Sequence, residues 1–314
     1  MALSGIQIYK MLPQTNCKEC GFATCLAFAM KLAAKQVELS DCPYVTEESK
    51  KQLAESATPP VRLVTLKGKA GEAQAGNEVV LFRHEKKFFN RPGIFIRVVD
   101  TEDDDAIAGK VSAAAAYSVD YVGMDLTIDG FAIEAASGDG ARLAAVVEAV
   151  RASTGLPLML VGDDPTVLDG GLGKLEGETP LIMGADLTNW EAMADLATKY
   201  AAALGVRGGS LEELVELTEK LKEKGVEDLV LHPSVDGMSA SLALNTQIRR
   251  LALKNFRPLG YPTIAFAEDS GDPGRDSVVA AQAICKYAGF VVLDRFTPEL
   301  AYPLLVLREN IYTD

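Results

Sequence analysis

The sequence predicts an α/β protein in which a small helical, cysteine-bearing domain precedes a TIM (β/α)8 barrel. Eight short apolar runs alternate with helix-period segments between residues 94 and 293, which is the element order of a parallel sheet with crossover helices. No Gly-x-Gly-x-x-Gly follows any of these runs, which favours the closed barrel over a doubly wound open sheet built from the same units. Four of the five cysteines lie before residue 43, which sets the first zone apart from the rest of the chain.

Composition narrows the classes of protein to which the chain can belong. Its 314 residues carry 44 Asp and Glu against 31 Lys and Arg, and such an acidic surface repels phosphate backbones, so we expect no nucleic-acid partner. The longest apolar stretches, such as Val111–Val119, are interrupted before they reach membrane-spanning length. Met1–Leu12 lacks the pattern of a signal peptide. We therefore expect a cytoplasmic protein that does not enter a membrane.

The chain divides into three zones. The cysteine zone closes at Thr58-Pro59-Pro60, which is typical of a stiff linker. Arg62–Lys67 and Glu78–Phe82 are rich in Val and Leu, and a turn-rich stretch (Gly68–Asn77) separates them, which predicts a β-hairpin that covers the barrel. The predicted domains are a cluster-binding domain at residues 1–57, a linker and β-hairpin at residues 58–92, and a TIM barrel at residues 93–314.

The barrel elements are predicted from the alternating pattern. The predicted strands are apolar without strict alternation, as parallel strands buried on both faces are, and they comprise Ile94–Val98, Tyr121–Leu126, Pro157–Val161, Pro180–Met183, Ala203–Arg207, Asp228–His232, Pro262–Phe266 and Phe290–Leu293. The helical stretches between them include Asp103–Tyr117, Gly140–Ser153, Trp190–Ala201, Leu211–Lys224, Ser239–Leu253 and Asp276–Ala288.

The cysteine cluster predicts a metal centre rather than disulfides, because the chain is large, acidic and without a secretion signal. Its spacing is Cys17-x2-Cys20-x4-Cys25-x16-Cys42, with Pro43 directly after the last cysteine. Three ligands close together and one remote are typical of a [4Fe–4S] cluster. Structural zinc, which usually takes two knuckles of near-equal spacing, is the alternative, and unligated cysteines are a third.

Neighbouring residues suit a cluster loop. Gly21 lies where the backbone must turn sharply, and Thr24 can cap a helix over Cys25–Lys35 whose small and apolar face would pack over the cluster. The fifth cysteine, Cys285, lies within a predicted helix, and we expect it to be an inert core residue.

Three segments carry a resemblance to a known family. They are Pro13–Gly21 (PQTNCKECG), Phe88–Gly93 (FFNRPG) and Asn310–Asp314 (NIYTD). Together with the cysteine spacing and the barrel pattern, they resemble the large (gamma) subunit of the corrinoid/iron–sulfur protein. That protein belongs to the acetyl-CoA synthase/decarbonylase system of anaerobic bacteria and archaea, in which it takes part in carbon fixation.

The resemblance implies a methyl carrier rather than a stand-alone catalyst, within the corrinoid protein Co-methyltransferase class. A methyltransferase would load the carrier from methyl-tetrahydropterin, and acetyl-CoA synthase would receive the methyl group. The cluster, held by Cys17, Cys20, Cys25 and Cys42, would pass one electron to restore Co(II) to Co(I). The implied partners are a smaller barrel subunit in a heterodimer, the methyltransferase, acetyl-CoA synthase and a reductive activator.

The resemblance also raises an expectation about the corrinoid. Family members continue past the barrel into a cobalamin-binding domain, whereas the given sequence stops at Asp314. We therefore expect the cobalamin to belong to the full complex and not to be held by this chain alone.

Polar residues at the predicted carboxyl ends of the barrel strands are the remaining candidates, because TIM-barrel sites form there. No pair of them identifies a reaction, so we name no catalytic residue and expect a scaffold more than a ligand site. We expect a hydrogen-bonded structural role for the histidine among them. A redox barrel enzyme and a pterin-dependent methyltransferase with an appended cluster domain remain alternatives. The candidates are Asp125, Asp163, Asp164, Asp186, Arg207, His232, Glu268, Asp269, Asp294 and Arg295.

Overall fold

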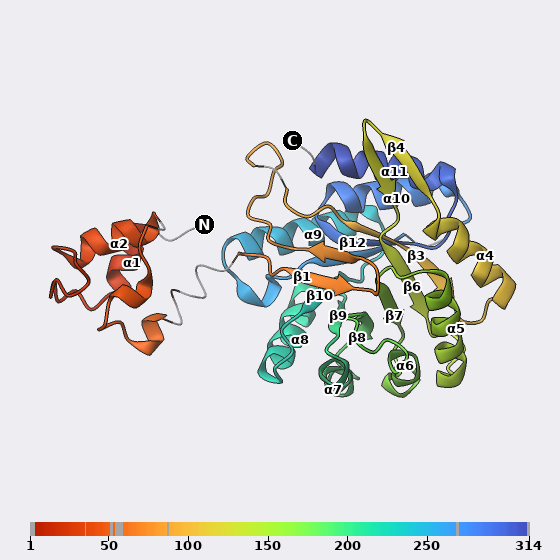
Figure 1. Ribbon diagram of the computed structural model, residues 1–314, viewed down its shortest axis with the longest axis horizontal. Helices are drawn as coiled ribbons and strands as arrows, with labels where there is room; N and C mark the ends of the chain where they lie inside the picture. The colour runs from red at the N-terminus through yellow and green to blue at the C-terminus, as the bar shows by residue number, and fades with distance from the viewer. Residues whose placement is uncertain are drawn as a thin grey trace. The chain divides into compact units, whose positions relative to one another are not determined.

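The computed structural model divides into two compact units, Met1–Pro60 and Val61–Asp314, which are drawn in Figure 1. The residues that the structure describes are 4–34, 36–50, 53, 59–86, 88–267 and 270–312.

In the described part of the first unit, two short helices, a 3-10 turn and a helical stretch at residues 47–50 surround a small apolar core. Helix α1 (Gly5–Met11) begins at a capping box made by Ser4 and Gln7. Helix α2 (Cys25–Ala33) begins at Thr24, whose side chain accepts a hydrogen bond from the N–H of Ala27, as predicted, although the helix ends two residues earlier than expected. The turn η1 (Leu39–Asp41) comes next. The core residues they share are Ile8, Leu12, Cys25, Phe28, Ala29, Cys42, Val45 and Leu53.

The second unit is a closed barrel of eight parallel strands, as the sequence predicted. The barrel closes where β12 pairs with β3, with Val291 opposite Ile94. Apolar side chains fill both the interior and the layer under the helices, which explains why the strands lack a polar face. In barrel order from the first strand they are β3 (Gly93–Val99), β6 (Gly130–Glu134), β7 (Leu158–Val161), β8 (Leu181–Ala185), β9 (Ala203–Gly208), β10 (Leu229–Pro233), β11 (Thr263–Ala267) and β12 (Ala288–Leu293).

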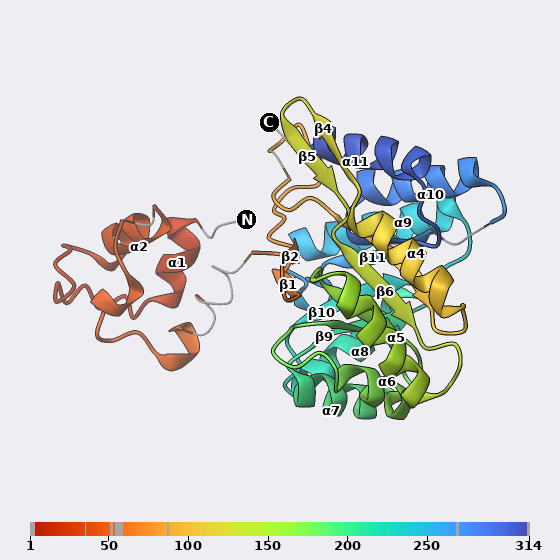
Figure 2. The same cartoon turned by 45° about the vertical axis from the view of Figure 1, so that its right-hand side comes forward.

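One barrel strand was assigned wrongly from the sequence. The run Tyr121–Leu126 is not a barrel strand, because it spans the turn of an antiparallel excursion formed by β4 (Ser118–Tyr121) and β5 (Met124–Thr127). Val122 and Gly123 both have positive φ, at 54° and 78°, which is the signature of a two-residue type I′ turn. The second barrel strand is β6 instead. Figure 2 shows the excursion beside the last helix of the chain.

Helices surround the barrel in the expected alternation. Helix α10 begins three residues before its predicted start, with Asp272 as its cap, and ends at Cys285. Cys285 is therefore the last residue of a helix and only partly buried, and this burial raises the pKa of its thiol. The helices are α4 (Asp104–Ala115), α5 (Gly140–Ser153), α6 (Pro165–Leu172), α7 (Trp190–Tyr200), α8 (Leu211–Glu223), α9 (Met238–Leu253), η2 (Arg257–Leu259), α10 (Pro273–Cys285) and α11 (Pro298–Tyr312).

A β-hairpin closes the amino-terminal end of the barrel. It pairs β1 (Val64–Lys67) with β2 (Glu72–Ala75), so its second strand lies inside the predicted turn and not at Glu78–Phe82. Leu66 packs into the barrel interior together with Phe95 and Phe290. Lys67 exchanges backbone hydrogen bonds with Thr179, which precedes β8. The predicted hairpin thus closes the end of the barrel opposite the one where TIM-barrel active sites form. We call β1 and β2 together the hairpin floor.

In the part of the chain that the structure describes, no helix has the length and apolar character needed to span a bilayer.

Candidate functional site

The segment from Gln14 to Cys25 is a tightly wound loop. Asn16, Lys18 and Gly21 have φ of 51°, 70° and 81°, so the backbone of this segment adopts the left-handed conformation at three closely spaced positions. The N–H of Gly21 donates to the carbonyl of Lys18 at 3.0 Å, which forms the sharp turn predicted at this glycine. The side-chain oxygen of Asn16 accepts a hydrogen bond from the N–H of Cys25 at 2.8 Å. The loop therefore ties the first ligand region to the start of α2.

The fourth cysteine reaches the same region through η1. The N–H of Cys42 donates to the carbonyl of Leu39, and Cys42 lies in the apolar core with Cys25. Tyr44 extends this contact, because its hydroxyl donates to Glu19 at 2.7 Å. Glu19 lies between the first two cysteines in sequence, so the Cys42 arm is fastened to the loop.

The four cysteine side chains of this region differ in their exposure to solvent. Cys17 is exposed, Cys20 is partly buried, and Cys25 and Cys42 are each 6% exposed. None of the four forms a disulfide. Thiols on one loop that reaches from water into an apolar pocket suit a centre that is shielded on one side and accessible to a partner on the other.

The spacing of these thiols bears on which metal they fit. Among the described residues, no three His, Cys, Asp or Glu side chains are close enough to hold one metal ion. A single zinc needs four ligands at about 2.3 Å from one point, whereas a cubane spreads its ligands around a body of four irons. The unequal spacing of the four cysteines along the chain is the feature that favours an iron–sulfur cluster over zinc.

At the carboxyl end of the barrel, two arginines pair with three of the candidate acids, Asp163, Asp186 and Asp294. Arg207, at the end of β9, contacts Asp163 and Asp186, each at 3.1 Å. Burial opposes ionisation of Asp186, but hydrogen bonds from Thr188 and Arg207 outweigh it and lower its pKa. Asp186 therefore stays ionised beside Arg207, which removes it as a proton donor.

A second charge cluster was missed in the sequence analysis. Arg97, on β3, pairs with Glu134 at the end of β6 and contacts Asp294, next to β12, at 2.9 Å. The cluster bridges neighbouring strands of the barrel across its closure point. An arginine inside the apolar run Ile94–Val98 was the available signal, because a charge in a buried strand needs a partner.

The other residues that the sequence suggested for a site at the carboxyl end of the barrel do not lie together. Asp164 caps α6 by accepting from the N–H of Thr166, and hydrogen bonds from this threonine lower its pKa. Arg295 lies 3.6 Å from Asp276. Asp125 lies in β5 of the excursion and not at the barrel end, so it is no longer a candidate. Glu268 and Asp269 lie outside the described residues.

His232 lies at the end of β10 beside the Phe266 ring, with ring centroids 5.0 Å apart. Burial, with a smaller contribution from Arg207, lowers its pKa from 6.5 to about 4. No described residue forms a hydrogen bond with its ring, so the hydrogen-bonded structural role expected for it is not found in the described chain.

Comparison with known proteins identifies both units. Residues 64–314 match the CO dehydrogenase/acetyl-CoA synthase delta subunit family, and residues 12–44, which contain all four clustered cysteines, match an Fe-S cluster family. The fold and the cysteine loop thus define a class of iron–sulfur proteins in which a cluster module precedes a TIM barrel.

Curated relatives specify the family. The chain is 41% identical to the corrinoid/iron-sulfur protein large subunit of Moorella thermoacetica, over 100% of this chain and 70% of that protein. It is 35% identical to the acetyl-CoA decarbonylase/synthase complex subunit gamma of Methanopyrus kandleri, over 99% of this chain and 70% of that protein. The chain therefore belongs to the family of these large, or gamma, subunits, which confirms the resemblance found in the sequence.

Solved structures confirm the barrel. Dihydropteroate synthase from Thermus thermophilus superposes with a TM-score of 0.53 at 18% identity, over 81% of this chain and 100% of that one. The Yersinia pestis enzyme superposes with a TM-score of 0.51 at 14% identity, over 70% of this chain and 93% of that one. At these identities the likeness shows the fold alone.

Proposed function

We propose that this chain is the electron-transfer and scaffold component of a corrinoid methyl carrier. The carrier would receive a methyl group from methyl-tetrahydropterin through a methyltransferase and deliver it to acetyl-CoA synthase. Residues 1–57 would act as the cluster domain, and the barrel that comes after them would supply the docking scaffold. The proposal rests on one observation: four free thiols, graded from exposed to buried, on a chain of this family.

A [4Fe–4S] cluster bound by Cys17, Cys20, Cys25 and Cys42 would supply one electron to return oxidised cobalt to its methyl-accepting state. The chain's own contribution is to hold three thiols on one loop and to bring the fourth, Cys42, to them on the arm after η1. Asn16 fixes the start of α2, and the contact between Tyr44 and Glu19 holds the arm that carries Cys42. Exposure of Cys17 leaves one side of the site within reach of a partner.

The barrel end supports a scaffold role rather than acid catalysis. Asp163 and Asp186 pair with Arg207, and Arg97 occupies the acids at the closure of the barrel. A general acid must hold a proton near neutral pH, and the lowered pKa of Asp186 prevents this residue from doing so. We propose that the methyl-transfer chemistry takes place on the assembled complex. That complex would include the smaller subunit, the methyltransferase, acetyl-CoA synthase, a reductive activator and the corrinoid.

The first test is anaerobic metal analysis of the purified chain with EPR after dithionite reduction. We expect about four irons per chain and the signal of a reduced cubane. Replacing Cys25→Ser should reduce the iron content, whereas Cys285→Ser, the matched control outside the loop, should leave it unchanged. Zinc bound in place of iron would contradict the proposal. Cobalt bound to this chain alone would move the corrinoid site onto the barrel.

A further inference from the structure

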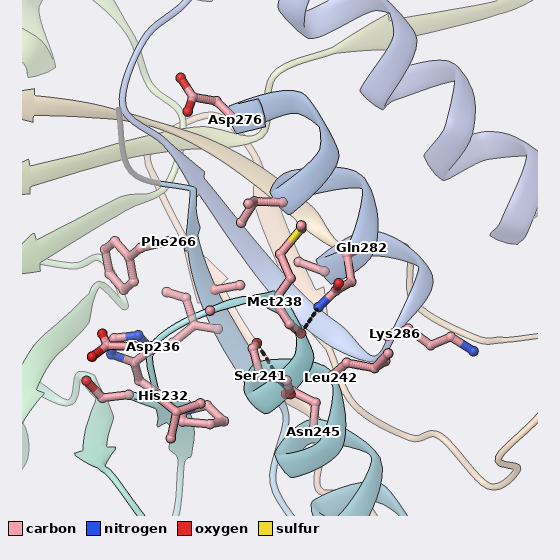
Figure 3. A pocket seen from close by; sticks show the side chains of 18 of the residues that line it. His232, Asp236, Met238, Ser241, Leu242, Asn245, Phe266, Asp276, Gln282 and Lys286 are labelled. Carbon is pink, nitrogen blue, oxygen red and sulfur yellow. Dashed lines mark hydrogen bonds between the residues drawn. The ribbon is translucent and has the colours of Figure 1, made fainter. Parts of the chain in front are cut away.

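A cavity of about 330 Å³ opens between α9 and α10, beyond the ends of β10 and β11. Figure 3 shows Phe266 and Asp236 on one side of it and Gln282 and Lys286 on the other, with Met238 between them. Polar and apolar side chains line it in about equal measure, and its polar groups come from different elements. Among the apolar lining residues are Leu242, Ile264, Phe266, Val279 and Ala283. A concave site in which polar groups converge between apolar side chains can bind a small molecule.

The first polar group is His232, whose ring lines the cavity and contacts Phe266. Because no described residue forms a hydrogen bond with its ring, both ring nitrogens remain available. The lowered pKa, about 4, keeps the imidazole neutral at physiological pH. A neutral imidazole offers one donor and one acceptor, so it can pair with a group that also has one of each.

Two side-chain amides lie on the helices that form the cavity walls. The amide nitrogen of Asn245 donates to the carbonyl of Ser241 at 2.9 Å, and that of Gln282 donates to the carbonyl of Met238 at 2.8 Å. These bonds fix the orientation of both amides. Described residues donate no hydrogen bond to either amide oxygen, so both oxygens remain as acceptors for N–H groups of a ligand.

The charges around the cavity are balanced. Arg275 and Lys286 contribute positive charge, while Asp236 and Asp276 contribute negative charge. These opposite charges balance, so the cavity has no net charge that would attract an ion of one sign. The groups that offer free hydrogen-bonding positions, His232, Asn245 and Gln282, are uncharged and suit an uncharged ligand.

We propose that this cavity binds a small, uncharged, planar nitrogen heterocycle. Its N–H groups would donate to Asn245 and Gln282, another ring edge would pair with His232, and its flat faces would contact the apolar side chains. The volume lies at the lower end of the range for ligand pockets, which suits one or two fused rings. The proposal does not depend on the cluster, so it stands or falls separately from the proposed function.

The sequence makes the test direct, because the chain has two histidines. His84 stacks on Phe82 in another part of the chain and serves as an internal control. The full chain labelled with 15N-histidine is titrated with adenine, hypoxanthine or pterin, and with 2-naphthol as a ring without nitrogen. We expect a saturable shift of the His232 imidazole signals with at least one heterocycle and no shift at His84. Absence of a saturable shift with all three heterocycles, or an equal shift with 2-naphthol, would overturn the proposal.

Variants then test the two acceptors. Asn245→Leu and Gln282→Met should each weaken binding of the responding heterocycle by about tenfold, the usual effect of losing one buried hydrogen bond. Gln74→Met, on the hairpin at the other end of the barrel, should leave the affinity unchanged. Binding that is equally tight in all three variants would show that these amides do not contact the ligand.

Discussion

The side-chain oxygen of Asn16 accepts a hydrogen bond from the N–H of Cys25, 2.8 Å away across nine residues of the cysteine loop. Asn16 also has a left-handed backbone, with φ of 51°, a conformation that asparagine and aspartate tolerate better than most residues. This one side chain thus fixes both the turn before Cys17 and the start of the helix that begins at Cys25.

Replacing Asn16→Ala should loosen the cysteine loop. The change removes the acceptor for Cys25 and puts a less tolerant residue in the left-handed conformation, at a combined cost of about 2 kcal/mol. We expect lower iron content after anaerobic purification and faster bleaching of the cluster absorbance by a chelator. Asn16→Asp, which keeps the acceptor and the backbone preference, is the control and should retain its iron. Equal loss in both variants would contradict the role assigned to the hydrogen bond.

Removing Arg97 should destabilise the barrel. Arg97→Met leaves Glu134 and Asp294 without the cation that both contact, and we expect a loss of about 2 kcal/mol, since the cluster is partly exposed. Urea unfolding followed by the fluorescence of Trp190, the single tryptophan, reports on the barrel. Arg62→Met removes an exposed arginine that pairs with Glu227 and Asp228 and should cost less than about 1 kcal/mol. If both variants lose the same stability, the Arg97 cluster has no special role.

The low pKa of His232 predicts an acid sensitivity with a definite direction. The folded-state pKa is about 4 and the reference value is 6.5, so the unfolded chain takes up the proton first. The stability of the folded state is therefore complete above pH 6.5 and declines as the pH falls towards 4. This residue contributes a loss on the order of 3 kcal/mol over that window.

The measurement for His232 is urea unfolding between pH 7.5 and 4.5, with His232→Gln beside the parent chain. Glutamine does not titrate, so the variant should lose less stability on acidification than the parent chain. His84→Gln, which removes the other histidine of the chain, is the matched comparison. Parallel curves for His232→Gln and the parent chain would mean that His232 gains its proton equally easily in both states.

The hairpin at the amino-terminal end of the barrel should contribute strongly to stability. Leu66 is fully buried among interior side chains, so Leu66→Ala should cost about 3 kcal/mol, within the usual range for a core leucine. Leu187→Ala, at a position that is 39% exposed, should cost much less. Thermal unfolding of both variants provides the comparison, and equal melting temperatures would show that the hairpin is not part of the core.

The barrel could be predicted from its sequence because its strands are short apolar runs between helices of strong periodicity. The second strand was misplaced because Tyr121–Leu126 is as rich in apolar residues as β6, and what distinguishes them is the turn at Val122 and Gly123. Similarly, the second hairpin strand contains Glu72 and Gln74, whose polarity hides it from an apolar pattern. Pairing between strands depends on partners far apart in the chain, and local composition does not record these partners.

In the candidate site, too, the features set by local sequence could be predicted, and those set by distant partners could not. The cap at Thr24 and the turn at Gly21 obey local rules and were predicted from the sequence, as the structure confirms, while the assignment of the four cysteines as cluster ligands stays a prediction. By contrast, the partners of Arg97 lie 37 and 197 residues away. The neutral state of His232 depends on its burial and on Arg207, which only the closed barrel brings close to it. Charge neutralisation across strands therefore had to be read from the structure.

The hairpin floor also determines where the chain can be truncated without exposing the interior of the barrel. A fragment that began at Gly93 would keep all eight strands and every loop at the carboxyl end. It would nevertheless open Phe95 and Phe290 to water, because Leu66 and Ala73 belong to the same interior cluster. We expect such a fragment to aggregate through its opened end, whereas one that begins at Val61 should remain monomeric. A segment that contributes no barrel strand thus determines whether the barrel can exist as a separate piece.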